Sequence, residues 1–283
     1  MKRFLLYILC AALLLCGCGE KMPTETAEPT YATAPPVTLK ADITTDATDA
    51  TDTTEAPATT DTAPIDTEAY FHHAVFVGDS IMEGIRQYVV RTRKSEPTLG
   101  DAKFVATTVG ISLADLVGDK EQPLYYSYKG KEQPLSDILA SMEKVERVFL
   151  LLGLNDLAGE SDPQTDEILE RYLRLVGDLQ ALLPKAEIIV MTNPPKVASA
   201  WLPPYIANRS LSNALIADFV SELRKMCTEN AIPYVDMYAA LVNASGVLPD
   251  EYCRDGYIHL NDVGARIAVD ALYAFAEKQG EMQ

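Results

Sequence analysis

Residues 74–80 read AVFVGDS, and this stretch decides the fold. The apolar run Ala74–Val77 predicts a buried strand, and the amphipathic stretch near Met82–Arg93 predicts a helix directly after it. The polar end of the stretch, residues 78–80, therefore lies at a strand-to-helix turn. Backbone N–H groups at the start of a helix have no partner within the helix, so such a turn can bind developing negative charge.

Short apolar runs and amphipathic stretches continue to alternate along the chain. Further strands are expected at residues 104–107, 147–152, 187–191 and 234–236. Further helices are expected at residues 165–183 and 208–230, and from Asn261 or Asp262, either of which can cap a helix, to Lys278. Alternating strands and helices favour an α/β protein whose parallel sheet is covered by helices on both faces.

Polar and small residues follow several of these strands. Ser80 ends the first strand, Gly110 follows the second and Asn155 follows the third, while Asp255 and His259 precede the last helix. Ligands of such sheets bind beyond the carboxyl ends of the strands, where these segments meet. We therefore expect the five residues to gather at one edge of the sheet.

The chemistry of this set is that of a serine nucleophile. A serine hydroxyl needs a base to remove its proton, and histidine is the usual one. Of the three histidines, His72 and His73 precede the first strand and lie at the opposite edge, which leaves His259. Acyl transfer also needs donors for the oxyanion, and Gly110 and Asn155 are suited to that role. Each residue alone also fits a turn or a helix cap, but together they indicate a catalytic site.

The order Gly-Asp-Ser (78–80), Gly110, Gly-Leu-Asn-Asp (153–156) and then Asp255 and His259 resembles the SGNH (GDSL-type) hydrolase family. The resemblance runs from the first strand to the C-terminus. It implies a flavodoxin-like three-layer αβα sandwich with a five-stranded parallel sheet. It also implies hydrolysis of esters, often acetyl groups on carbohydrate, without a metal or another cofactor.

The resemblance further assigns a role to each residue. Ser80 is the nucleophile and donates its N–H to the oxyanion hole, which Gly110 and Asn155 complete. His259 is the base, and Asp255 orients it.

Two departures from the family pattern bear on these roles. The residues just before Gly110 are Thr, Thr and Val, where the family often has Asn. Asp255 also lies four residues before His259, where the family usually has three. Because Gly256 can adopt conformations closed to other residues, we expect the loop to bulge and Asp255 still to accept a hydrogen bond from His259. Two other acids lie nearby, Asp250 and Asp262.

The first eighteen residues are expected to be a signal segment. Lys2 and Arg3 precede an apolar run, Phe4–Leu15, that is too short to span a membrane. The segment resembles a bacterial lipoprotein signal, in which the cysteine of the cleavage box receives lipid. That cysteine would be Cys18, which anchors the protein to the cell membrane on its extracytoplasmic face. An ordinary signal peptide with incidental cysteines is the alternative.

Composition divides the remaining chain into a linker and a domain. Residues 19–70 are rich in Thr, Asp, Ala and Pro, which predicts a disordered linker, and residues 71–283 form the hydrolase domain. The formal net charge of -17 argues against nucleic acid as a partner. No obligate protein partner is indicated, and three histidines without a Cys or His cluster give no support to a metal site. Cys227 is expected to be a buried thiol, and its pairing with Cys253 is left open.

The loop at residues 192–207 contains several prolines as well as Trp201 and Tyr205. Loops at this edge of a sheet often carry function, and a flat indole can stack on a sugar ring. Trp201 and Tyr205 are therefore candidate substrate-binding residues, although Trp201 equally fits packing of the loop onto the domain.

These observations predict an extracytoplasmic serine esterase acting on a small ester or an acylated carbohydrate through an acyl-enzyme on Ser80. An acyltransferase that uses the same site to acylate sugar hydroxyls is one alternative. A surface lipoprotein that binds carbohydrate without catalysis is the other.

Overall fold

The structure is a computed structural model, and it describes residues 66–159, 165–198 and 211–281. The predicted signal segment with Cys18, the predicted linker up to residue 65, and Trp201 and Tyr205 lie outside the described residues.

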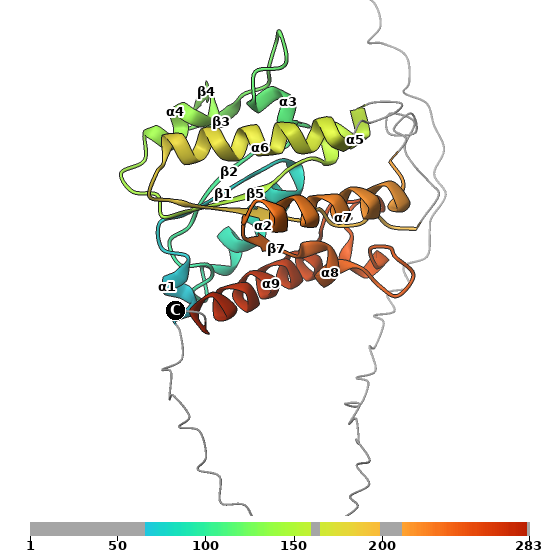
Figure 1. Cartoon of the computed structure of the whole chain (residues 1–283). Coiled ribbons are helices and arrows are strands. Elements are labelled where there is room, and N and C mark those ends of the chain that lie inside the picture. Colours follow the sequence, from blue (N-terminus) through green and yellow to red (C-terminus); the bar gives the residue numbers. More distant parts are fainter. Residues whose placement is uncertain (1–65, 160–164, 199–210, 282–283) are drawn as a thin grey trace, which may run out of the picture. The chain divides into compact units, whose positions relative to one another are not determined.

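Five parallel strands form a central sheet in the order β2-β1-β5-β6-β7 (Figure 1). Their bounds are β1 Ala74–Gly78, β2 Lys103–Ala106, β5 Arg147–Leu151, β6 Glu187–Met191 and β7 Tyr234–Val235. Strands β1, β5 and β6 are almost wholly buried, as their unbroken apolar runs predict. The predicted five-stranded parallel sheet of an α/β fold is confirmed.

Helices cover both faces of this sheet (Figure 1). Their bounds are α1 Thr67–Tyr70, α2 Ser80–Thr92, α3 Leu113–Leu116, α4 Leu135–Ala140, α5 Leu154–Gly159, α6 Thr165–Leu182, α7 Asn213–Glu229, α8 Met237–Leu241 and α9 Asp262–Glu281. A short 3₁₀ helix, Asp250–Tyr252, precedes α9. Helix α9 packs against α2 and α8, whereas α6 packs against α3, α4, α5 and α7. The chain leaves β1 toward β2 and later leaves β5 in the opposite direction, so right-handed crossovers place α2 and α6 on opposite faces.

Aromatic rings form the core between the sheet and α9. Phe76 in β1 stacks on Phe104 in β2 and on Phe149 in β5, with ring centroids 5.0 and 4.6 Å apart. The strand register places these three residues directly opposite one another. Phe275 of α9 meets Phe149 edge to face at 6.4 Å. This ladder fixes the strands around β1 in register, and thereby fixes the place where β1 ends and the polar turn begins.

Several elements differ from the sequence-based expectation. An antiparallel hairpin of β3 (Tyr126–Tyr128) and β4 (Lys131–Gln133) was not expected. Helix α7 begins at residue 213 rather than 208, because the Ser212 hydroxyl caps it by accepting a hydrogen bond from the Leu215 N–H at 3.1 Å.

Helix α9 is capped by the Asn261 side chain, which accepts from two backbone N–H groups at 2.9 and 3.1 Å. Cys227 is buried as expected, and both Cys227 and Cys253 are free thiols.

Helix α1 lies inside the last residues of the predicted linker and is firmly attached to the domain. Tyr70 is buried, and the Arg147 guanidinium lies 4.0 Å from the centre of its ring. Arg147 also donates a hydrogen bond to the Tyr70 carbonyl at 2.9 Å. The Glu68 carboxylate accepts from the Gly100 N–H at 2.5 Å and from the Tyr273 hydroxyl of α9. Residues 66–70, which the composition assigned to the linker, are therefore part of the folded domain.

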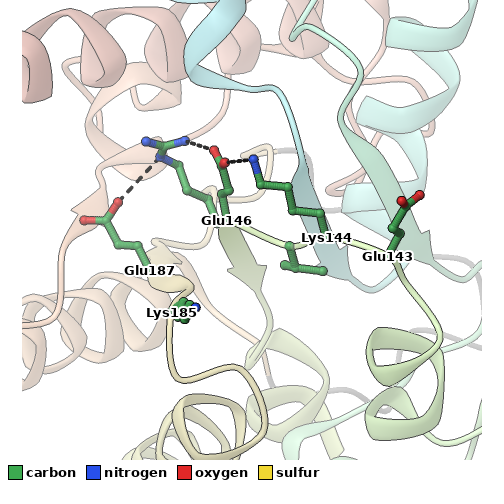
Figure 2. Close-up of a pocket in the computed structure, with 7 residues that line it drawn as sticks. Glu143, Lys144, Glu146, Lys185 and Glu187 are labelled. Carbon is green, nitrogen blue, oxygen red and sulfur yellow. Dashed lines mark ion pairs between the residues drawn. The ribbon is translucent and has the colours of Figure 1, made fainter.

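An ion-pair network surrounds Arg147 at the amino edge of the sheet (Figure 2). Glu146 lies 3.6 Å from Arg147 and 2.5 Å from Lys144, and Glu187 lies 3.7 Å from Arg147 on its other side. These residues line a surface hollow of about 550 Å³ together with Glu143, Val145 and Lys185. Three glutamates balance three cations there, and the network holds Arg147 over Tyr70.

No helix in the described ranges is long and apolar enough to cross a lipid bilayer.

Candidate active site

The proposed nucleophile stands at the first position of α2. Strand β1 ends at Gly78, and the Asp79 side chain caps α2 by accepting a hydrogen bond from the Ile81 N–H at 2.9 Å. Ser80 is thereby held at the carboxyl edge of the sheet, where it is half-buried. Its hydroxyl lies 2.9 Å from Nε2 of His259.

A short hairpin before α9 carries both His259 and Asp255. Cys253 and Leu260 form an antiparallel bridge, and the Arg254 N–H donates to the His259 carbonyl at 2.8 Å. Gly256 takes a φ of +67° at the tip of this hairpin. A residue with a side chain is strained in that conformation, so Gly256 lets the loop close around its extra residue.

The Asp255 carboxylate uses its two oxygens for different partners. Oδ2 lies 2.5 Å from Nδ1 of His259, so the expected contact across the four-residue spacing is present. Oδ1 accepts hydrogen bonds from the backbone N–H groups of Tyr257, Ile258 and His259 at 3.0, 3.1 and 3.2 Å. The carboxylate thus shapes the loop with one oxygen and orients the imidazole with the other.

The ionised state of Asp255 fixes the tautomer of His259. Burial acts to raise the pKa of Asp255, but the hydrogen bond and charge of His259, followed by the Tyr257 N–H and the Cys253 thiol, outweigh it and hold the pKa below its usual value. An ionised carboxylate only accepts hydrogen bonds, so Nδ1 of His259 carries the proton that it donates to Asp255. Nε2 is then free to accept the proton of the Ser80 hydroxyl, as a general base must.

Asn155 and Gly110 reach the same place from two other strand ends. Asn155 lies in the first turn of α5, directly after β5, and its Nδ2 donates to Oδ2 of Asp79 at 2.9 Å and to the Ile111 carbonyl at 3.0 Å. A Cβ atom at Gly110 would lie 2.9 Å from Oδ1 of Asn155, so only glycine lets the two segments approach this closely. Asp156 ties the loop after β2 to α5, since its carboxylate accepts from the Leu113 N–H at 2.9 Å.

These residues surround one cavity of about 290 Å³. Its polar wall contains Asp79, Ser80, Thr108, Gly110, Asn155 and His259. Its apolar wall contains Ile81, Leu154, Ala158, Leu211, Tyr257 and Ile258. The structure therefore brings Ser80, Gly110, Asn155 and His259 together around one space, with Asp255 directly behind His259.

Sequence reasoning gave no role to Asp79 or to the apolar wall. Asp79 is 2% exposed, and burial raises its pKa to about 6, while the Ile81 N–H and the charge of His259 act to lower it and the charge of Asp156 acts to raise it. Its position directly before a helix signals a cap, but its burial depends on segments far away in the chain. The apolar wall comes from four separate segments, and no local pattern marks it.

Comparisons with known proteins agree with this geometry. A model of the GDSL-like lipase/acylhydrolase family matches residues 76–267. No curated protein sequence matches the chain.

Solved structures share the fold at low sequence identity. A GDSL-like lipase from Bacteroides thetaiotaomicron is 17% identical with a TM-score of 0.54, and the match covers 75% of this chain and 90% of that one. A protein from Bacteroides fragilis assigned as an acylhydrolase is 20% identical with a TM-score of 0.53, and the match covers 73% of this chain and 87% of that one. At such identities the likeness shows a shared fold.

Proposed function

The chain belongs to the GDSL-like lipase/acylhydrolase family and is therefore a hydrolase, and from this premise we propose that it cleaves esters through an acyl-enzyme on Ser80. The observation that carries the proposal is the continuous row of hydrogen bonds from Ser80 through His259 to Asp255. Such a row activates a serine hydroxyl, which is otherwise a poor nucleophile.

In the first half of the reaction, Ser80 Oγ attacks the ester carbonyl carbon while its proton passes to Nε2 of His259. The carbonyl oxygen becomes an oxyanion, which the backbone N–H groups of Ser80 and Gly110 and the Asn155 amide stabilise. When the tetrahedral intermediate collapses, the imidazolium returns its proton to the departing alcohol oxygen. The acyl group is left on Oγ.

In the second half, water attacks the acyl-enzyme as Nε2 of His259 takes one of its protons. Collapse breaks the bond to Oγ, returns the proton to Ser80 and releases the carboxylic acid. Asp255 remains ionised throughout and stabilises the imidazolium that forms in each half. Its lowered pKa is consistent with this role.

The test uses the full chain, a chromogenic acetyl ester and a serine-reactive phosphonate. We expect turnover and a single phosphonate adduct on Ser80, and loss of both in Ser80→Ala. Turnover should fall by several orders of magnitude while the circular dichroism spectrum is unchanged. A folded Ser80→Ala protein that keeps most of its ester hydrolysis contradicts the assignment.

For the substrate, we propose acetyl esters carried on carbohydrate. The family resemblance supports this choice, and the cavity beside Ser80 offers both a polar and an apolar wall. A panel of acetylated oligosaccharides and simple aryl esters tests the proposal, with long-chain acyl esters as the contrast. Faster release of long acyl chains than of acetate from sugars would contradict it. Supplying a sugar acceptor separates hydrolysis from transfer, because transfer yields an acylated sugar.

For the location, we propose that a lipid on Cys18 anchors the protein to the extracytoplasmic face of the cell membrane. The proposal rests on the sequence of the first eighteen residues, in which Gly17 and Cys18 follow the apolar run.

A further inference from the structure

The amide of Asn155 has no N–H group to spare in this structure. Nδ2 carries two hydrogens, one directed at Oδ2 of Asp79 and the other at the Ile111 carbonyl. To stabilise an oxyanion, the amide must share or release one of these two bonds. The two differ in strength, because a hydrogen bond to a charged acceptor is stronger than one to a neutral acceptor.

Asp79 is built to hold this amide in place. Its Oδ1 accepts from the Ile81 N–H at 2.9 Å at the start of α2, and its Oδ2 accepts from Asn155 at 2.9 Å. The carboxylate thus connects the helix that carries the nucleophile to the helix that carries the oxyanion donor. Gly110 packs against the oxygen of the same amide, so closely that a Cβ atom at this position would clash with it.

We propose that Asp79 is a positioning residue of the oxyanion hole, whose carboxylate holds one N–H of Asn155 so that the other, which rests on the Ile111 carbonyl, is shared with the oxyanion. The inference rests on the proposed function, since it concerns the same site and the same intermediate. An amide held on one side loses less orientational freedom when charge develops, which lowers the barrier rather than tightening substrate binding. Loss of the Asp79 carboxylate should therefore lower kcat and leave KM unchanged.

The charged and titratable groups around Asp79 make the contact dependent on pH. The charge of His259 in the hairpin lowers the pKa of Asp79, and the charge of Asp156 in α5 raises it. The charge of Asp79 in turn helps to raise the pKa of two buried hydroxyls, those of Tyr126 in β3 and Tyr172 in α6. Burial raises the pKa of Asp79 to about 6, so the carboxylate accepts from Asn155 with full charge only above that pH. Protonation of Asp79 at acid pH should therefore lower kcat.

A double-mutant cycle tests whether Asp79 acts through Asn155. The kcat and KM for 4-nitrophenyl acetate are measured in the wild type, Asp79→Asn, Asn155→Ala and the double variant of the full chain. Asp79→Asn should lower kcat about 10- to 100-fold with KM little changed. Asn155→Ala should lower kcat about 100- to 1,000-fold. In the Asn155→Ala background, Asp79→Asn should cost less than about twofold, because the amide that it positions is gone. An equal loss in both backgrounds overturns the proposal.

A second readout follows the pH dependence. Around pH 6, log kcat of the wild type should fall more steeply with falling pH than that of Asp79→Asn, which lacks the carboxylate that takes up a proton there. An unchanged slope in an Asp79→Asn protein with normal circular dichroism overturns the proposal.

A third measurement needs no Asp79 variant, and so covers the case in which that variant does not fold. In a His259→Gln protein, the side-chain NH₂ signals of Asn155 are followed by nuclear magnetic resonance across the pH range around 6, where Asp79 titrates. They should shift with a single midpoint above that pH, because the charge of His259 that lowers the Asp79 pKa is gone, and the absence of a shift contradicts the proposal. If the wild type neither turns over esters nor labels at Ser80, the proposed function is wrong, whereas this measurement still tests the Asp79–Asn155 contact.

Discussion

Two oxygens of one carboxylate perform separable tasks at Asp255, and two substitutions separate them. Asp255→Ala removes both the loop contacts and the contact to His259, so activity and stability should both fall. Asp255→Asn keeps an oxygen for the loop N–H groups but presents an amide N–H to Nδ1, which favours the wrong imidazole tautomer. In the serine protease that defines this effect, the same change lowers kcat about 10⁴-fold.

We therefore expect Asp255→Asn to lower the melting temperature less than Asp255→Ala does, because it keeps an oxygen for the loop but loses the ionised carboxylate, and to lose most of its activity. Asp255→Ala should retain roughly 10- to 100-fold more kcat than His259→Ala, as removal of an orienting carboxylate costs less than removal of the base. Thermal melts and steady-state kinetics check both statements. Near-normal turnover in both Asp255 variants would mean a Ser80–His259 pair oriented by another group.

Gly110→Ala tests whether the site depends on the close approach of Gly110 to the Asn155 amide. The new Cβ would lie 2.9 Å from Oδ1 of Asn155, and the amide cannot give way without losing its bonds to Asp79 and Ile111. We expect kcat to fall about 10- to 100-fold in a folded protein. Gly177→Ala on α6 is the matched control, because nothing lies within 4 Å of its added Cβ. That change should raise stability by about 0.5–1 kcal/mol and leave kcat unchanged.

The buried charge of Asp79 also predicts how stability varies with pH. Its pKa is raised to about 6, so the folded protein holds the proton more tightly than the unfolded chain does. The stability that Asp79 contributes is therefore fully present below the ordinary aspartate pKa of about 3.9 and is lost as the pH rises through about 6.

Asp79→Asn has no such proton, so its melting temperature relative to the wild type should rise between about pH 4 and about pH 7. A difference for Asp79→Asn that falls or stays constant with pH contradicts the raised pKa.

At the scale of elements, the long apolar strands and helices were predictable and the short polar ones were not. Runs such as Ala74–Val77 are buried on both faces of the sheet, so their composition alone marks them. The hairpin of β3 and β4 has three residues in each strand, with Ser127, Lys131 and Glu132 exposed, and only the Lys129–Gly130 turn signals it. Helix α1 is a single turn that exists because of partners distant in the sequence.

Tyr70→Ala tests how much that single turn contributes. The ring is buried between the Arg147 guanidinium and Phe275, at the edge of the sheet away from Ser80. Its loss should reduce the free energy of unfolding by about 3–5 kcal/mol, as for other buried aromatic residues, and leave kcat unchanged. Tyr70→Phe keeps the ring over Arg147 and should retain most of the stability. Urea unfolding and ester turnover of both variants decide this, and a large loss of kcat at full stability would contradict it.

At the scale of the whole molecule, the gathering of the site was predictable from topology. Ser80, Gly110 and Asn155 each follow a strand, and the carboxyl ends of parallel strands share one edge. The raised pKa of Asp79 and its hydrogen bond with the Asn155 amide could not be predicted. Both arise from side chains that are distant in the sequence and meet only in the folded structure.

The proposed membrane anchor makes a prediction for the full chain. Cys18→Ser should release the protein from the membrane fraction or block its processing, because the thioether to lipid cannot form. Fractionation and mass spectrometry of the amino terminus check this, with Cys16→Ser as the matched control that should remain membrane-bound. Unchanged membrane retention of the Cys18→Ser protein contradicts the proposal.

The two ends of the described domain have a practical consequence. Helix α1 leads into the amino edge of the sheet, and α9 runs back to pack against α1 (Figure 1). The residues that line the cavity, in contrast, lie at the carboxyl edge. A protein beginning at Asp66 can therefore be coupled to a bead, an electrode or a host scaffold through either end. In every such orientation the catalytic face is turned to the bulk solution, so an immobilised enzyme should keep the turnover of the free one.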